Sequence, residues 1–340
     1  MKTTKNELSQ TLYQYHNLED CYKIRSQIEI EAEDIKGDIK ERAKDWEINK
    51  KAYELEMKRL NLDQEYNLYC HKYIYLVNRN DFLTYLWIYD IETKIREEII
   101  MDTHEALTDA TCIILLPNDE LFCYGTYDDF SGIACIIDVK NYSLKRLLPY
   151  GKSCCASGGL YHNNSVYIFG GNIEDNWCEQ TLAERFDLEK NMWFKLTPLP
   201  TASKNCSCVL FKHIILIAGF NYNKLYAYNI EIDSYSTIYN IDLNSETSKI
   251  LCYGNLKFYA IEQGRSISEC KDGDWNFWTT VGQWDIDCNI LQNNWVFKDN
   301  HIFIGTIYNS FYNRIGYFNF DLSTKSIQID KLFEDFEYQE

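Results

Sequence analysis

The segment Ser165–Pro200, SVYIFGGNIEDNWCEQTLAERFDLEKNMWFKLTPLP, carries three short runs of alternating apolar residues separated by turn-forming residues. The first run, Val166–Phe169, ends at the pair Gly170 and Gly171. Alternation of this kind predicts strands that are packed on both faces of a stacked sheet. The two glycines predict a bend at which no side chain can be accommodated beside a neighbouring backbone.

Two further positions complete this unit. Asp187 follows Phe186 at the end of the second run and precedes Leu-Glu-Lys-Asn, so its carboxylate is placed to accept backbone N–H groups in a tight turn. Trp193 opens the third run and predicts a large apolar contact between neighbouring units. One such unit cannot bury both of its faces alone, so several units must stack in a ring or an array.

This segment resembles a kelch repeat, whose hallmarks are the double glycine, an aromatic-Asp pair and a Trp at fixed spacing. The resemblance implies a β-propeller and a general role in binding. Weaker copies of the unit recur along the chain, with glycines at positions 125, 170, 219, 264 and 305, which are 45, 49, 45 and 41 residues apart. Four strands in each such period are typical of a propeller.

We therefore predict a mainly β fold, with a six-bladed kelch-like propeller over residues 65–332. The first of its six units begins with a strand at Asn67–Cys70, and the sixth includes a strand at Ile302–Gly305. The residues expected to mark the structural repeat are Gly125, Gly170, Gly171, Asp187, Trp193, Gly219 and Gly305.

The first 64 residues have a different composition, dense in Glu and Lys, with no proline and one glycine. From Leu18 onward, apolar residues recur with heptad spacing, which predicts a long amphipathic helix, a coiled-coil-like arm. Polar residues on the seam (Arg25, Arg42 and Asn49) weaken a simple dimer and leave attachment along a larger assembly open. Residues 333–340 are predicted to be an acidic tail.

The net charge of −17 disfavours nucleic acid and anionic membranes as partners and favours proteins with basic patches. The 13 cysteines are odd in number and lie mostly in apolar runs, which predicts buried, reduced thiols. The chain shows no apolar signal segment at its start and no apolar run long enough to span a membrane. We expect a cytoplasmic protein, with the cytoskeleton as one candidate place of attachment.

Metal and catalytic sites are not predicted. Four histidines (His71, His162, His213 and His301) occupy equivalent turns, which lie far apart around a propeller and cannot share a metal. No nucleophile motif or phosphate-binding glycine loop is present. We expect no cofactor and no enzyme activity. The alternative is a small-molecule enzyme, of the sugar-acid epimerase or hydrolase type, that uses the central channel.

Binding is better supported, because the loops after the second strand of each blade gather on one face. Aromatic residues beside Asp and Arg in such loops are typical of interface hot spots, although they also occur folded back on a rim. We predict a non-catalytic protein–protein interaction scaffold, whose loop face binds a protein or peptide and whose arm anchors to an assembly or self-associates. The expected partner-binding residues are Tyr127, Asp128, Asp175, Trp177, Tyr222, Arg265, Tyr308, Phe311 and Arg314.

Overall fold

A computed structural model describes residues 73–331 with gaps at 81–82, 102–106, 108–110, 118, 126–133, 148–153, 174–177, 221–222, 239–240, 242, 244–248, 255–256, 263–265, 272–277, 284–288, 299–300, 309–313 and 325. The chain divides into two compact units, Met1–Cys70 and His71–Glu340. The predicted arm (1–64), the predicted strand Asn67–Cys70 and the predicted tail (333–340) lie outside the described residues.

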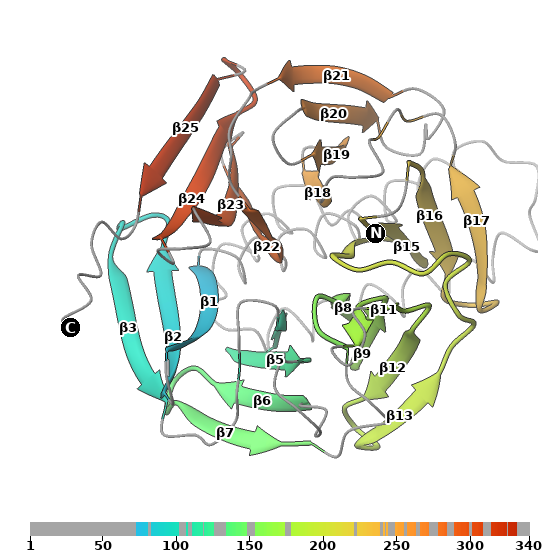
Figure 1. Cartoon of the computed structure of the whole chain (residues 1–340), viewed down its shortest axis with the longest axis horizontal. Coiled ribbons are helices and arrows are strands. Elements are labelled where there is room, and N and C mark those ends of the chain that lie inside the picture. The colour runs from blue at the N-terminus through green and yellow to red at the C-terminus, as the bar shows by residue number, and fades with distance from the viewer. Residues whose placement is uncertain are drawn as a thin grey trace, which may run out of the picture. The chain divides into compact units, whose positions relative to one another are not determined.

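The described residues of the second unit form β-strands arranged as a β-propeller, with radial sheets around a central axis (Figure 1). The first sheet contains β1 (Tyr73–Asn80), β2 (Leu83–Asp90) and β3 (Arg96–Met101). The second contains β4 (Cys112–Leu116), β5 (Glu120–Tyr124), β6 (Ala134–Asp138) and β7 (Ser143–Arg146). The third contains β8 (Gly158–His162), β9 (Ser165–Phe169), β12 (Ala183–Asp187) and β13 (Met192–Lys195).

The remaining sheets follow the same order. The fourth contains β14 (Ser207–Phe211), β15 (Ile214–Ala218), β16 (Leu225–Asn229) and β17 (Ser234–Ile238). The fifth contains β18 (Lys249–Gly254), β19 (Lys257–Glu262), β20 (Ser266–Lys271) and β21 (Trp278–Gln283). The last contains β22 (Asn289–Lys298), β23 (His301–Tyr308), β24 (Arg314–Asp321) and β25 (Ser326–Lys331). A two-stranded ribbon, β10 (Asn172–Ile173) with β11 (Cys178–Glu179), lies between β9 and β12 in the sequence.

Each of these sheets is an antiparallel meander, and in the third sheet the ribbon β10–β11 lies between the paired strands β9 and β12. The chain completes one sheet before starting the next. The structure has five four-stranded blades and one three-stranded sheet, which corrects the prediction of six four-stranded blades. Strands β22 and β23 both contact β1, so the last sheet lies beside the first sheet in the ring (Figure 1).

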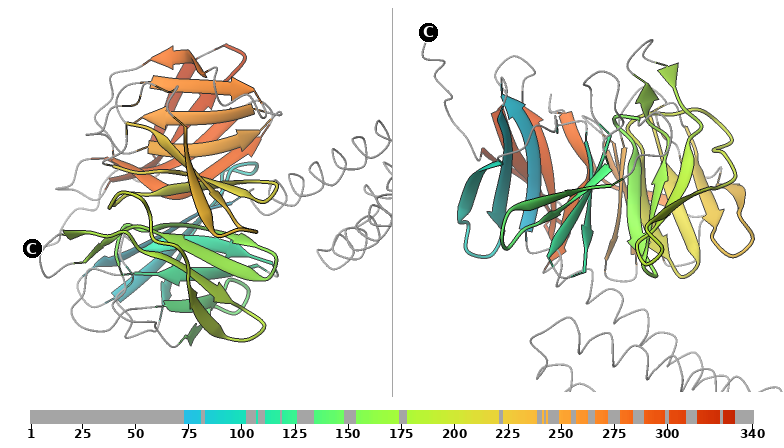
Figure 2. Two further views of the ribbon diagram at one scale, coloured as in Figure 1. Left: turned by 90° about the vertical axis from the view of Figure 1, so that its right-hand side faces the viewer. Right: turned by 90° about the horizontal axis from the view of Figure 1, so that it is seen from below.

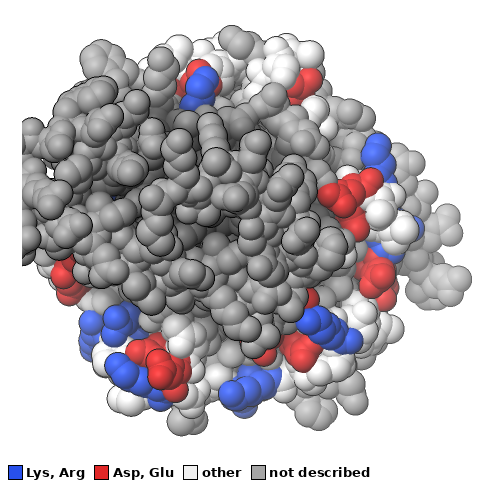
Figure 3. Space-filling model, turned by 180° about the vertical axis from the view of Figure 1, so that it is seen from behind, with Lys and Arg blue, Asp and Glu red and all other residues white. Residues whose placement is uncertain are grey.

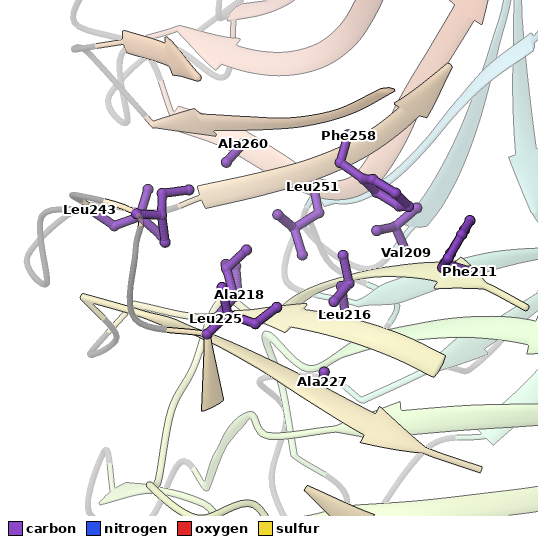
Figure 4. Packing of buried hydrophobic residues seen from close by; sticks show 12 residues of the cluster. Val209, Phe211, Leu216, Ala218, Leu225, Ala227, Leu243, Leu251, Phe258 and Ala260 are labelled. Atoms are coloured by element: carbon purple, nitrogen blue, oxygen red, sulfur yellow. The ribbon is translucent and has the colours of Figure 1, made fainter. Parts of the chain in front are cut away.

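The hydrophobic core lies between neighbouring sheets. The side views in Figure 2 show how these sheets follow one another around the axis. Between the fourth and fifth sheets, Leu216, Leu225 and Leu251 are fully buried and pack with Phe258 (Figure 4). These residues come from strands of both sheets, so neither sheet has a core of its own. The packing confirms that one repeat cannot bury its faces without its neighbours.

Trp193 lies on β13 at the contact between the second and third sheets. Its ring centroid is 4.9 Å from that of Phe186 on its own sheet, and 6.1 Å and 5.6 Å from those of Phe122 and Tyr124 on the second sheet. The large apolar contact between units that was predicted for Trp193 is confirmed.

The glycines at the ends of the second strands permit close approach between backbones. Gly125, Gly170 and Gly171 have φ angles of 82°, 64° and 112°, in the left-handed region. A side chain on Gly125 would collide with the carbonyl oxygen of Cys154, and a Cβ on Gly170 would lie 2.6 Å from that of Ser203. The predicted role of this bend is confirmed. Gly305 differs, because it lies inside β23 opposite Tyr317 rather than at the end of a strand.

Candidate interaction face

The two ends of the blades are built differently. At one end, the third strand turns into the fourth in four of the four-stranded sheets, and β2 turns into β3 in the three-stranded sheet, through a short turn that begins with Asp or Asn; we call this the turn end. The side-chain oxygen accepts backbone N–H groups two or three residues on, at 2.8 Å to 3.3 Å, in five of the sheets. The residues that begin these turns are Asp90, Asp138, Asp187, Asn229 and Asp321.

These turns are also joined to the turns between the first and second strands. Val139 N donates to Asp119 O at 3.0 Å, and Ile230 N donates to His213 O at 2.9 Å. In the third sheet Leu188 N donates to Asn164 O at 3.0 Å in the same way. These bonds satisfy backbone groups of the turns within the same sheet. We therefore assign the turn end a role in the structure of each blade.

The opposite end is where the second strand runs into the third and where one sheet leads to the next; we call this the loop end. Most of the buried polar side chains lie here, at the first or last residues of strands or directly beside them. They are Thr84, Thr111, Ser157, Asn172, Glu184, Ser203, Ser207, Lys249 and Glu262. Several bond to the glycine backbone: Thr111 Oγ1 donates to Gly125 O at 2.9 Å and Ser157 Oγ to Gly170 O at 3.0 Å.

Lys249 and Glu262 form the first of two buried charged junctions at the loop end. They are opposite each other on β18 and β19, and both side chains are buried. Lys249 Nζ donates to Gly219 O at 3.1 Å, across to the fourth sheet, and Ser266 Oγ donates to Glu262 Oε2 at 3.3 Å. Burial lowers the pKa of Lys249 to about 8, against the opposing effect of the Glu262 charge.

Glu184, Tyr124 and Cys154 form the second junction, between the second and third sheets. Glu184 shares a face of β12 with Phe186, and that face packs on the second sheet. Burial raises the pKa of Glu184 to about 7, while Lys195 on β13 acts against the shift. Burial, and then the charges of Cys155 and Glu184, raise the pKa of the Cys154 thiol to about 12.

Neither junction was recognised in the sequence, although a signal was present. Glu184 occupies an apolar-face position of a strand in which Phe186 is the next residue on that face. Lys249 likewise shares the face of Leu251 at the start of β18. A charged residue in phase with an apolar stripe is costly to bury, and this is the pattern that marks both junctions.

The predicted partner-binding residues fall in the loops at the loop end, and most lie outside the described residues: Tyr127, Asp128, Asp175, Trp177, Tyr222, Arg265 and Phe311. Tyr308 and Arg314 are opposite each other at the ends of β23 and β24, where only their backbone is described. The segment predicted to be a long loop after Gly171 contains the ribbon β10–β11, which the sequence did not indicate.

Two of the four histidines singled out in the sequence have a clear setting. His301 Nδ1 lies 2.9 Å from Asn319 Oδ1, and His213 accepts through its backbone in the turn described above. Among the described residues, no group of three or more His, Cys, Asp or Glu is placed to hold a metal ion. Likewise, no helix in that part of the chain is long and apolar enough to cross a membrane.

Basic and acidic side chains lie interspersed around the rim that is visible in Figure 3. Among the residues coloured in Figure 3, the acidic side chains do not gather in a single patch. At the turn end, Lys140 Nζ is 3.1 Å from Asp119 Oδ2, and Lys190 Nζ is 3.5 Å from Asp187 Oδ2. Ion pairs near the surface contribute little to stability.

The geometry of the loop end suits the binding of another molecule. Buried hydrogen bonds fix the strand ends, and the connections that follow vary in length and carry aromatic and charged residues. Neither a protein-family model nor a curated protein sequence matches the chain.

Proposed function

We propose that this protein is a non-catalytic interaction scaffold, whose loop end binds a protein or peptide partner. The observation that carries the proposal is the asymmetry between the two ends of the blades. Short, self-satisfied turns close one end, whereas the other combines a rigid, hydrogen-bonded base with the long connections that contain the predicted partner-binding residues. Binding residues are concentrated on loops held by a rigid scaffold.

The kelch-like character of the blades belongs to the same proposal. The aromatic-Asx pair supports the repeat, because it begins the turn in four sheets: Tyr89-Asp90, Phe186-Asp187, Tyr228-Asn229 and Phe320-Asp321. The arm of residues 1–64 is proposed to anchor the scaffold to a larger assembly or to self-associate in the cytoplasm, with the cytoskeleton as one candidate.

The test is affinity capture from the native cell with the full chain and two matched variants. In the loop-end variant, residues 126–132 and 174–177 are replaced with Gly and Ser; in the turn-end variant, Lys140, Lys190 and Glu231 are replaced with Ala. All three of these turn residues are exposed. We expect the loop-end variant to lose the proteins that the natural chain retains, and the turn-end variant to keep them. Loss with the turn-end variant alone would overturn the proposal.

A further inference from the structure

Three polar side-chain atoms are buried without a hydrogen-bond partner at the junction of the second and third sheets. They are Tyr124 Oη, Asn172 Oδ1 and Glu184 Oε2, on side chains of residues that are 1%, 2% and 3% exposed. Buried polar atoms in folded proteins are normally hydrogen-bonded, so three unpartnered polar atoms at one junction need an explanation.

The segment Cys154-Cys155 links these three residues. Gly125, directly after Tyr124, packs against the Cys154 carbonyl, and Gly171, directly before Asn172, packs against the Cys154 side chain. Cys155 and Asn172 exchange backbone hydrogen bonds, of 3.0 Å from Cys155 N and 2.8 Å from Asn172 N. The backbone that follows β5 and the backbone that begins β10 are therefore both packed against this segment.

The groups that face Glu184 differ from one packing element to the next. Tyr124 on β5 and Cys154 before β8 are neutral, because burial raises the pKa of both well above neutrality. Ile168 on β9, opposite Glu184, is apolar. On β13 the opposite residue is Lys195, whose side chain is exposed and whose charge favours the carboxylate. The ionised carboxylate thus faces two neutral polar groups and one solvated cation.

We propose that Glu184 is a proton-operated switch at this junction, closed when the carboxyl is protonated and loosened when it is ionised. A protonated carboxyl is neutral, and its O–H is a donor, which the unpartnered acceptor Asn172 Oδ1 at the same junction lacks. An ionised carboxyl at the same place retains a buried, unpartnered charge. Burial raises the pKa of Glu184 to about 7, so the switch operates near neutral pH.

The raised pKa of Glu184 determines how the stability of the junction changes with pH. The folded state holds the proton more tightly than the unfolded chain, whose Glu titrates at about 4.3. The junction is therefore most stable below that value and loses stability as the pH rises to about 7. The switch stands on its own, but its effect on partner binding rests on the function proposed above.

The test is amide hydrogen exchange in the full chain between pH 5 and pH 8, with rates corrected for intrinsic exchange. We expect protection of the Cys155 and Asn172 amides to fall as the pH rises, by up to about a hundredfold. The amide of Ile230, in the fourth sheet, serves as the internal control. In Glu184→Gln, protection should be high and independent of pH, whereas the exposed Glu189→Gln should behave as the natural chain.

An equal pH slope in Glu184→Gln, or no slope in the natural chain, would overturn the switch. If Glu184→Gln fails to fold, carbon NMR of the natural chain decides instead: titration of the Glu184 carboxyl near pH 7 supports the switch, and titration near that of an exposed Glu refutes it. Amide exchange can depend on pH as predicted while partner capture does not change with pH. In that case the switch at Glu184 would stand, and it would have no effect on partner binding.

Discussion

The turn end and the loop end of the blades both connect antiparallel strands, but different contacts hold the connections in place. At the turn end, one Asx side chain and a few backbone bonds close each connection within a single sheet. At the loop end, buried side chains tie one sheet to the next, as Lys249 does to Gly219. Local sequence therefore specifies the turns, whereas contacts between sheets specify the base of the loops.

The largest effect is expected at the close approach of backbones at the loop end. Gly170→Ala introduces a Cβ 2.6 Å from Ser203 O and against Cys206 Sγ, at a residue whose φ is 64°. We expect a loss of at least about 3 kcal/mol in the free energy of unfolding, or failure to fold. Urea denaturation measures it, with the exposed Lys190→Ala as the control; an unchanged midpoint in Gly170→Ala would contradict the packing described here.

A loss of about 3 kcal/mol is expected for Lys249→Met, because it leaves the buried Glu262 carboxylate without its cation. The double variant Lys249→Met with Glu262→Gln should recover most of that loss, since no buried charge remains. Thermal denaturation of the single and double variants is the measurement. A double variant that is less stable than Lys249→Met would show that the pair acts through something other than its charge.

A smaller effect is expected where the outer strand of the third sheet is tied to a turn of the fourth. Asp233 accepts Thr197 N at 2.9 Å and the Tyr228 hydroxyl at 2.7 Å, and Tyr235 donates to Thr197 O at 2.9 Å. We expect Asp233→Ala to cost about 1 to 2 kcal/mol and Tyr228→Phe less. Chemical denaturation distinguishes them; equal losses would mean that the Tyr228 hydroxyl carries the whole contribution.

The smallest effect is expected at a single turn. Asp138→Ala removes an acceptor for Lys140 N at 2.8 Å and for Asn141 Nδ2 at 2.7 Å, and all of these groups are exposed. The loss should be about 0.5 to 1 kcal/mol, because water replaces exposed hydrogen bonds. Asp138→Asn, which retains the side-chain acceptor, is the control. A loss for Asp138→Ala as large as that for Lys249→Met would remove the distinction between the two ends.

The sequence predicts the strands and turns well, because their signals are local. The predicted strand Val166–Phe169 forms β9, which begins one residue earlier at Ser165, and the turn at Asp187 forms as expected, with its Oδ1 accepting Lys190 N at 2.9 Å. The glycine bend was also predictable, since a positive φ leaves a residue-type signature.

Other features depend on contacts that the local sequence does not carry. Gly305 looks like the other repeat glycines in its spacing, yet β23 continues past it to Tyr308. The burial of Glu184 is set by Tyr124 and Cys154, which are far from it in the chain. The predicted partner-binding residues were placed by loop position alone, so their side-chain contacts remain predictions.

Site-specific photo-crosslinking of the full chain in its native cell tests directly whether the loop end binds the partner. A photoreactive phenylalanine replaces Trp177 or Phe311 in the loops, or the exposed Met192 or Ile232 at the turn end, which are 54% and 69% exposed. We expect the loop positions to form adducts with a partner protein and the turn positions to form none. Adducts from Met192 and Ile232 alone would place the interaction at the turn end and contradict this expectation.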